Sequence, residues 1–159
     1  MSLQPVAESI KAHLPEILEE WQSAAECDPW IALPRESRVN DLENVARGLV
    51  DVALSEGPSA EMRLKEVRWA AGHGKHRLEM GLPDHIIFAE YRILQRALWN
   101  FDTANFPAST AHQATFRLDA CTTLATLASL RGYHYADFEH RGEWPQVVDQ
   151  LADKWPSWS

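Results

Sequence analysis

The chain has 159 residues, 45% of them hydrophobic and 24% charged, and a formal net charge of −8 at pH 7. These values are typical of one folded domain with a sizeable core, and they argue against a disordered chain. The negative charge, without any basic block, argues against nucleic acid or an anionic membrane surface as a partner.

No apolar run approaches the ~20 residues that a membrane-spanning helix needs. Residues 1–5 lack the basic-then-apolar pattern of a secretory signal, so a cytoplasmic protein is expected. Cys27 and Cys121, widely spaced, predict neither a disulfide framework nor a four-ligand zinc site.

The first predicted helix covers residues 5–27, because apolar residues recur there at helical spacing. Pro15 lies inside it and should kink it or divide it near His13 and Leu14. Residues 28–34 break the pattern, and their apolar side chains are expected to form a lid over one end of a bundle.

A second helix is expected from about Arg35 or Ser37 to Ser55. Ser59 is a good N-cap for a third helix, which ends at Gly81, a residue type typical of left-handed helix C-caps. Pro83 opens a fourth helix, expected to end near Asn100 and to be followed by a loop over residues 102–107.

The fifth predicted helix is the longest and runs from about Thr110 to His140, with Gly132 expected to bend or end it. The predicted fold is therefore all-α, a bundle of about five to six helices with a long C-terminal helix. We expect residues 1–142 to form the main domain. Residues 143–159 then form a tryptophan-containing tail that packs on the bundle or on a partner.

Residues 70–81 are the most informative stretch, because Gly72 and Gly74 interrupt a helix at a cost of ~1 kcal/mol each. They indicate close approach of another helix, which is the commoner reason, or a ligand pocket. His73 and Arg77 share a helical face beside this notch. The link to the fourth helix is short, so it is expected to run antiparallel and to bring Glu90 or Tyr91 towards that face.

Two partners are open for Arg77, a ligand carboxylate or Glu90, and the internal partner is favoured. No metal is expected, but His73 and His76 with His85 are an alternative metal set, and either of the first two is an alternative haem ligand. The sequence has no nucleophile motif and no phosphate-binding loop, so we expect no enzyme and no cofactor.

The sequence also carries a pattern that resembles a known family. It reads Ala70-Ala71-x-His73-Gly74-x-x-Arg77-x-x-x-Gly81, followed by Glu90-Tyr91-x-x-Leu94. This pattern resembles the N-terminal sensory domain of RsbRD-type stressosome co-antagonists, and similar domains precede sensor histidine kinases in many bacteria. The likeness covers roughly residues 6–135.

The resemblance implies an all-α, distantly globin-like input domain that perceives a signal without catalysis. Its motif marks the ligand-binding candidates, namely His73, Gly74, Arg77, Glu90 and Tyr91. Such domains usually continue into a kinase or an antagonist module, so a free-standing sensor and an excised input domain are both open.

The leading hypothesis is thus a cytoplasmic bacterial signal-transduction sensor of stress-response type that binds a small ligand or a partner protein. The expected partners are a second copy of the chain and a separate kinase or anti-sigma-antagonist type of effector. The alternatives are a haem- or metal-binding helical protein and a structural dimerisation module.

Overall fold

The computed structural model describes residues 2–31 and 40–156, and each element that it describes is a helix. In chain order these are α1 (Gln4–Ala12), α2 (Leu14–Glu26), α3 (Asn40–Leu54), α4 (Ala60–Glu79), α5 (His85–Asn105), α6 (Ala108–His134), α7 (Ala136–His140), α8 (Trp144–Val147) and the 3-10 helix η2 (Asp149–Lys154). The predicted all-α bundle with a long C-terminal helix is confirmed, since α6 alone has 27 residues.

More helices are found in the described residues than expected, because two predicted helices are divided and the C-terminal tail forms α8 and η2. The break at His13, between α1 and α2, is the one predicted from Pro15, which lies in the first turn of α2. The break at Tyr135, between α6 and α7, was not predicted. α6 ends at His134, two residues after Gly132, where the sequence predicted a bend or an end. Gly132 itself packs against α4.

Three local predictions at helix ends can be judged. Ser59 caps α4, since its Oγ accepts a hydrogen bond from the Met62 amide at 3.1 Å. Gly81 has the predicted left-handed conformation, with φ of 75°. The end of α5 was predicted wrongly, because the helix continues to Asn105 and takes in most of the expected loop. The expected start of the second helix lies outside the described residues.

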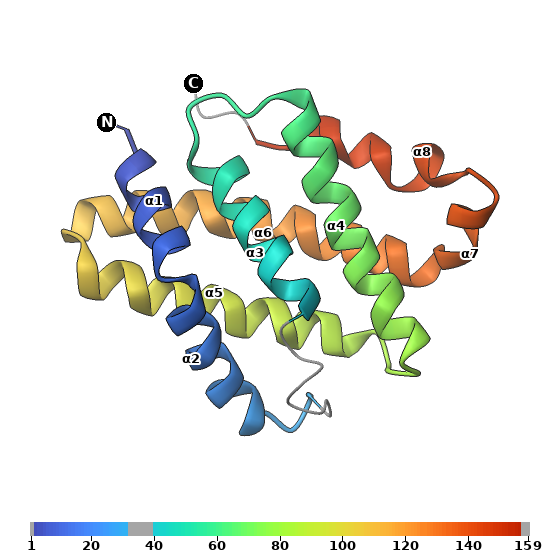
Figure 1. The fold of residues 1–159 in the computed structure, drawn as a ribbon, viewed down its shortest axis with the longest axis horizontal. Helices are drawn as coiled ribbons and strands as arrows, with labels where there is room; N and C mark the ends of the chain where they lie inside the picture. Colours follow the sequence, from blue (N-terminus) through green and yellow to red (C-terminus); the bar gives the residue numbers. More distant parts are fainter. Residues whose placement is uncertain (1, 32–39, 157–159) are drawn as a thin grey trace.

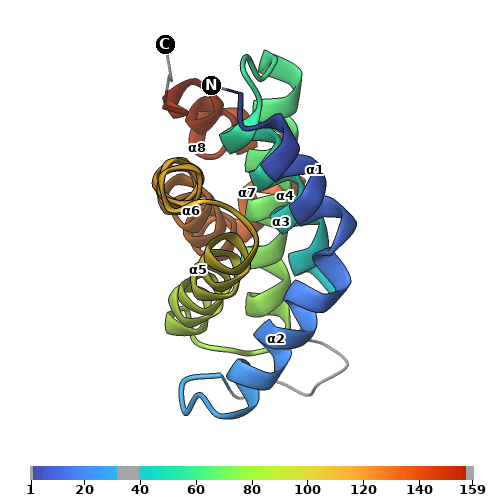
Figure 2. The same cartoon turned by 90° about the vertical axis from the view of Figure 1, so that its left-hand side faces the viewer.

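The helices form two layers, which Figures 1 and 2 show from two sides. α5 and α6 run side by side as one layer, and α1 to α4 cross over one face of it. Ile10, Trp21, Leu49, Ile87 and Leu94 are among the fully buried side chains that fill the space between the layers. The other face of the α5–α6 layer is left uncovered by these helices.

α4 and α6 cross at very short range, and a glycine on each helix makes this possible. A Cβ atom on Gly74 would overlap the carbonyl oxygen of Ser129, and one on Gly132 would overlap that of Ala71. Gly72, by contrast, has open space beside it. Of the two explanations left open for the glycine notch, close helix packing accounts for Gly74.

The C-terminal segment returns along α4 and packs on it as far as residue 156 (Figure 1). The Trp155 indole donates to the carbonyl of Arg63 at 3.3 Å, and Arg68 forms an ion pair with Asp149 at 2.7 Å. Trp158 lies outside the described residues. No helix in the described part of the chain has the length and apolarity needed to span a lipid bilayer.

Candidate functional site

Three ionisable side chains lie together at the centre of the molecule: His73 and Arg77 on α4 and Glu90 on α5. Each of them is at most 1% exposed. The Arg77 guanidinium donates from Nε to Glu90 Oε1 at 2.9 Å and from Nη2 to Oε2 at 3.0 Å. This two-point contact is the strongest geometry an arginine and a carboxylate can form. The favoured internal partner of Arg77 is therefore confirmed.

His73 lies on the other side of the same carboxylate. Its Nε2 is 3.1 Å from Glu90 Oε2, but without the alignment of a hydrogen bond, and its Nδ1 has no hydrogen-bond partner among the described residues. Burial by itself would raise the pKa of Glu90, but the neighbouring His73 and Arg77 side chains outweigh this effect and hold the pKa below its ordinary value. Glu90 is thus a carboxylate kept ionised inside the core.

Tyr91 extends this cluster towards α6. The Ser129 hydroxyl donates to the carbonyl of Ala70 at 2.7 Å, so the Tyr91 hydroxyl, 2.8 Å from Ser129 Oγ, is the donor in that pair. The Tyr91 ring meets the His73 ring edge-on, with 6.0 Å between the centroids. Burial, as the main cause, raises the pKa of Tyr91, which stays neutral.

The five residues marked by the sequence motif therefore come together. Glu90 contacts both His73 and Arg77, and the Tyr91 ring lies against His73. Gly74 packs against Ser129, whose side chain accepts a hydrogen bond from Tyr91. Their atoms fill a contact between helices. This arrangement supports a structural and relaying role for the cluster more than direct contact with a ligand.

The alternative metal ligands are not brought together. His73 is buried beside Glu90, His76 is half-buried, and His85 is exposed and meets the Trp30 ring edge-on at 5.3 Å. In the part of the chain that the structure describes, no three His, Cys, Asp or Glu side chains form a group that could hold a metal ion.

Sequence reasoning missed a second buried carboxyl group, that of Glu66 on α4. It is 1% exposed, and neither of its oxygens has a hydrogen-bond partner among the described residues. Burial, with a smaller contribution from Asp51, raises the pKa of Glu66 well above its ordinary value. The signal was present, because positions 66, 70, 73 and 77 share one helical face.

A groove of about 1030 Å³ lies on the uncovered face of the α5–α6 layer. Its walls are the segment 28–30, α5 and α6, and we call it the α5–α6 groove. Its apolar lining includes Trp30, Phe88, Leu127 and Leu130. Sequence analysis did not find it, because it is formed by three segments far apart in the chain.

Trp30 is held over one end of this groove by Asp28. The Asp28 carboxylate accepts a hydrogen bond from the Trp30 amide at 2.8 Å and another from the Arg92 guanidinium at 2.6 Å. Burial would raise the pKa of Asp28, but these two donors outweigh it and lower the pKa. The segment predicted as a lid therefore lies against α5, as far as its described residues show.

Tyr91 is the one motif residue that also lines the groove. It separates the groove from the buried cluster, with its ring against His73 and its hydroxyl bonded to Ser129. A molecule in the groove would therefore meet the cluster through this single side chain.

Comparison of the chain with protein-family models, curated proteins and solved structures finds no match. The resemblance to RsbRD-type sensory domains consequently stays a prediction from the motif.

Proposed function

We propose that the chain is a non-catalytic sensory domain that binds a small, largely apolar molecule in the α5–α6 groove. The observation that carries this proposal is the groove itself, which combines a volume of about 1030 Å³ with aromatic and aliphatic walls. Small-molecule sites share this character, with a few polar groups that fix orientation. Here Arg92 and Gln95 supply those polar groups.

The exposed aromatic side chains at the groove support the same proposal. Trp30 is 60% exposed and Phe88 53% exposed, and large apolar side chains grouped on a surface commonly mark an interaction site. In the proposed mechanism, a bound molecule covers both and presses on Tyr91. The displacement then passes to Ser129 at the tight crossing of α4 and α6.

The signalling assignment rests on the motif that ends at Tyr91 and Leu94. In this proposal the domain works in the bacterial cytoplasm as a homodimer, and it biases a separate kinase or an anti-sigma-antagonist type of effector. His73, Arg77 and Glu90 hold the helix crossing in one arrangement and do not touch the ligand.

The test is binding of Nile red, an uncharged fluorescent probe of apolar sites, to the purified protein. We expect saturable binding that Phe88→Ala and Leu127→Asp weaken at least tenfold. Phe116→Ala is the matched control, because Phe116 is 68% exposed on the same layer but does not line the groove. Binding that survives both groove variants would contradict the proposal.

Native mass spectrometry and an absorption spectrum of the protein as purified test the haem and metal alternatives. A haem band or a stoichiometric metal would replace the present proposal with a cofactor-binding one. A co-purifying organic molecule, displaced by Nile red, would support the groove.

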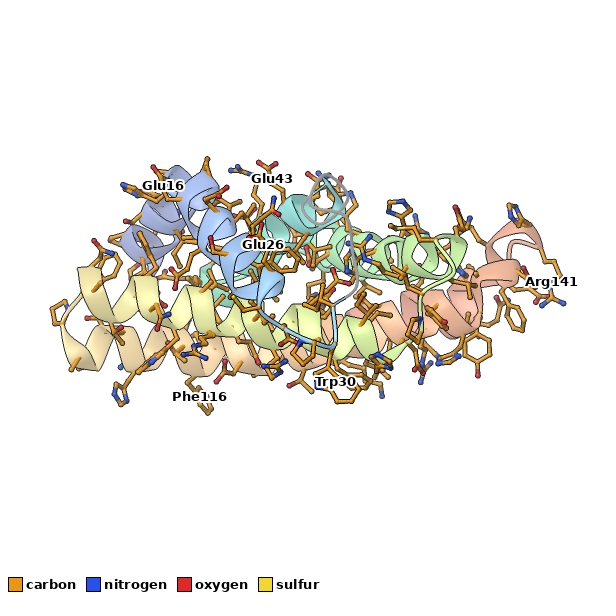
Figure 3. The ribbon with its side chains drawn as sticks, turned by 90° about the horizontal axis from the view of Figure 1, so that it is seen from below. Glu16, Glu26, Trp30, Glu43, Phe116 and Arg141 are labelled. Atoms are coloured by element: carbon orange, nitrogen blue, oxygen red, sulfur yellow. The ribbon has the colours of Figure 1, made fainter. Side chains whose placement is uncertain are left out.

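A second candidate function is dimerisation through the same face. Trp30 and Phe116 both point away from the α5–α6 layer on its uncovered side, as Figure 3 shows. Phe116 and Leu127 are eleven residues apart on α6, which places them on one side of that helix. An apolar strip of this kind is typical of a contact between subunits.

Analytical ultracentrifugation of the wild type and of Phe116→Asp tests this candidate. A dimer that becomes a monomer in the variant, with unchanged Nile red binding, would assign dimerisation to the Phe116 end of the face. A wild-type monomer would remove the candidate.

A further inference from the structure

The polar groups of the α5–α6 groove are distributed unevenly, and this restricts the kind of molecule that fits it. On the α6 wall, the hydroxyls of Thr122, Thr123 and Thr126 donate to the carbonyls of Leu118, Asp119 and Thr122, at 2.6, 3.1 and 2.8 Å. Their donors are used within the helix. The α6 wall therefore offers methyl groups and no hydroxyl donor to a ligand.

The α5 wall offers donors. Phe88, Arg92 and Gln95 are spaced by four and three residues, so they form one stripe along that helix. An arginine has five N–H donors, and within the described part of the chain Arg92 uses only Nη2, which donates to Asp28. The Gln95 amide lies one turn further along, beside the same groove.

The charged residues that line the groove bear on the same question, the kind of ligand that it binds. Asp28 and Arg92 are its only carboxylate and its only arginine or lysine among the lining residues that the structure describes. The Asp28 charge is matched by Arg92, and no second carboxylate lines the groove to repel an anion. These two charges cancel, so the groove lining has no net formal charge, although the chain as a whole carries −8. The N–H donors of Arg92 and Gln95 are therefore what suits the α5 wall to a negatively charged group.

We propose that the α5–α6 groove binds an aromatic carboxylate, with its ring between Trp30 and Phe88 and its carboxylate on Arg92 and Gln95. The spacing fits, because Phe88 and Arg92 are neighbours one helical turn apart, about 5–6 Å between Cβ atoms. This inference rests on the proposed function, since it assumes that the groove is the ligand site.

The ligand carboxylate and Asp28 share one guanidinium in this arrangement. Asp28 also holds the Trp30 amide, so the segment over the groove is linked to ligand binding through Arg92. Occupation of Arg92 by the ligand weakens the hold on Asp28. In this arrangement the Trp30 segment responds to the charge of the ligand, whereas Tyr91 responds to the size of the ligand.

The experiment is isothermal titration calorimetry with 2-naphthoate and its uncharged analogue 2-naphthamide. For the wild type we expect 2-naphthoate to bind at least tenfold more tightly than 2-naphthamide. Arg92→Gln should abolish this difference by weakening only the anion, and Phe88→Ala should weaken both probes. Arg96→Gln is the matched control, one turn further along α5, because Arg96 does not line the α5–α6 groove. It lines an adjoining hollow of about 540 Å³, which shares Asp28 and Arg92 with the groove.

Equal affinity for the two probes in the wild type would overturn the carboxylate assignment and leave the groove as an apolar site. A preference for 2-naphthoate that Arg96→Gln abolishes and Arg92→Gln keeps would also overturn it. If neither probe binds, the inference fails. The proposed function then stands or falls separately on Nile red binding.

Discussion

Glu90 and Glu66 are both carboxyl groups inside the same bundle, yet their surroundings are opposite. Glu90 has the Arg77 guanidinium on both oxygens and His73 beside it, and its pKa is lowered. Glu66 has no hydrogen-bond partner among the described residues, and its pKa is raised. One carboxyl is held as an anion by its partners, and the other is favoured as a neutral acid by burial.

Burial alone therefore does not decide what a core carboxyl does. Two features around Glu66 lower the stability of the folded chain. The buried carboxyl has no hydrogen-bond partner among the described residues. Gly48 stands within α3, where a Cβ would overlap Glu66 Oε2, and a glycine inside a helix is destabilising. Around Glu90 the same kind of burial is offset by a two-point ion pair.

The largest effect is expected from Arg77→Met, which leaves Glu90 as a buried anion without its main partner. We expect a loss of ~3–5 kcal/mol in the free energy of unfolding, measured with urea, because an uncompensated buried charge is costly. The control is Arg68→Met, which breaks the surface ion pair with Asp149, and it should cost below ~1 kcal/mol. Similar losses in the two variants would contradict the role given to the buried pair.

A smaller effect separates the two glycines near these carboxyls. Gly74→Ala places a Cβ on the Ser129 carbonyl, so α4 and α6 must move apart, at a cost of ~1–3 kcal/mol. In Gly48→Ala the new atom meets the end of the Glu66 side chain, which can rotate, and alanine favours the helix by ~1 kcal/mol. Thermal denaturation should therefore show the larger loss for Gly74→Ala, and the reverse order would refute this reasoning.

Replacing Glu66 should have the opposite sign. Glu66→Leu removes a buried carboxyl without partners and keeps similar volume, so we expect a gain of ~1–3 kcal/mol in the free energy of unfolding at pH 7. Glu61→Leu is the control, on an exposed position of the same helix, and should lie within ~0.5 kcal/mol of the wild type. A loss of stability in Glu66→Leu would show that Glu66 has a stabilising partner.

The pH dependence of Glu66 is the finest test. Its pKa is raised in the folded protein above the ordinary 4.5, so its stabilising contribution is complete below pH 4.5 and is lost as the pH rises through the folded pKa. The stability advantage of Glu66→Gln over the wild type should therefore grow as the pH increases above 4.5. Asp102, whose pKa burial raises to about 7, acts with the same sign but is common to both proteins. An advantage independent of pH would rule out ionisation of Glu66 as the cause.

Local features of the fold followed from the sequence alone. The division of the first helix by Pro15, the Ser59 cap and the left-handed Gly81 depend on a residue's own backbone and on neighbours a few positions away. The pairing of Arg77 with Glu90 was also accessible, because a short link makes α4 and α5 neighbours. Such short-range restrictions on the backbone depend on the local sequence and not on the rest of the fold.

Tertiary structure decided what lies between distant segments. Only the crossing of α4 over α6 shows that Gly74 and Gly132 are packing contacts, and only the bundle buries Glu66 against Gly48. The α5–α6 groove needs segment 28–30, α5 and α6 together. Burial and hollows arise from contacts far apart in sequence. The pattern of residues predicted most of the helices, the Ser59 cap and the approach of Glu90 to Arg77.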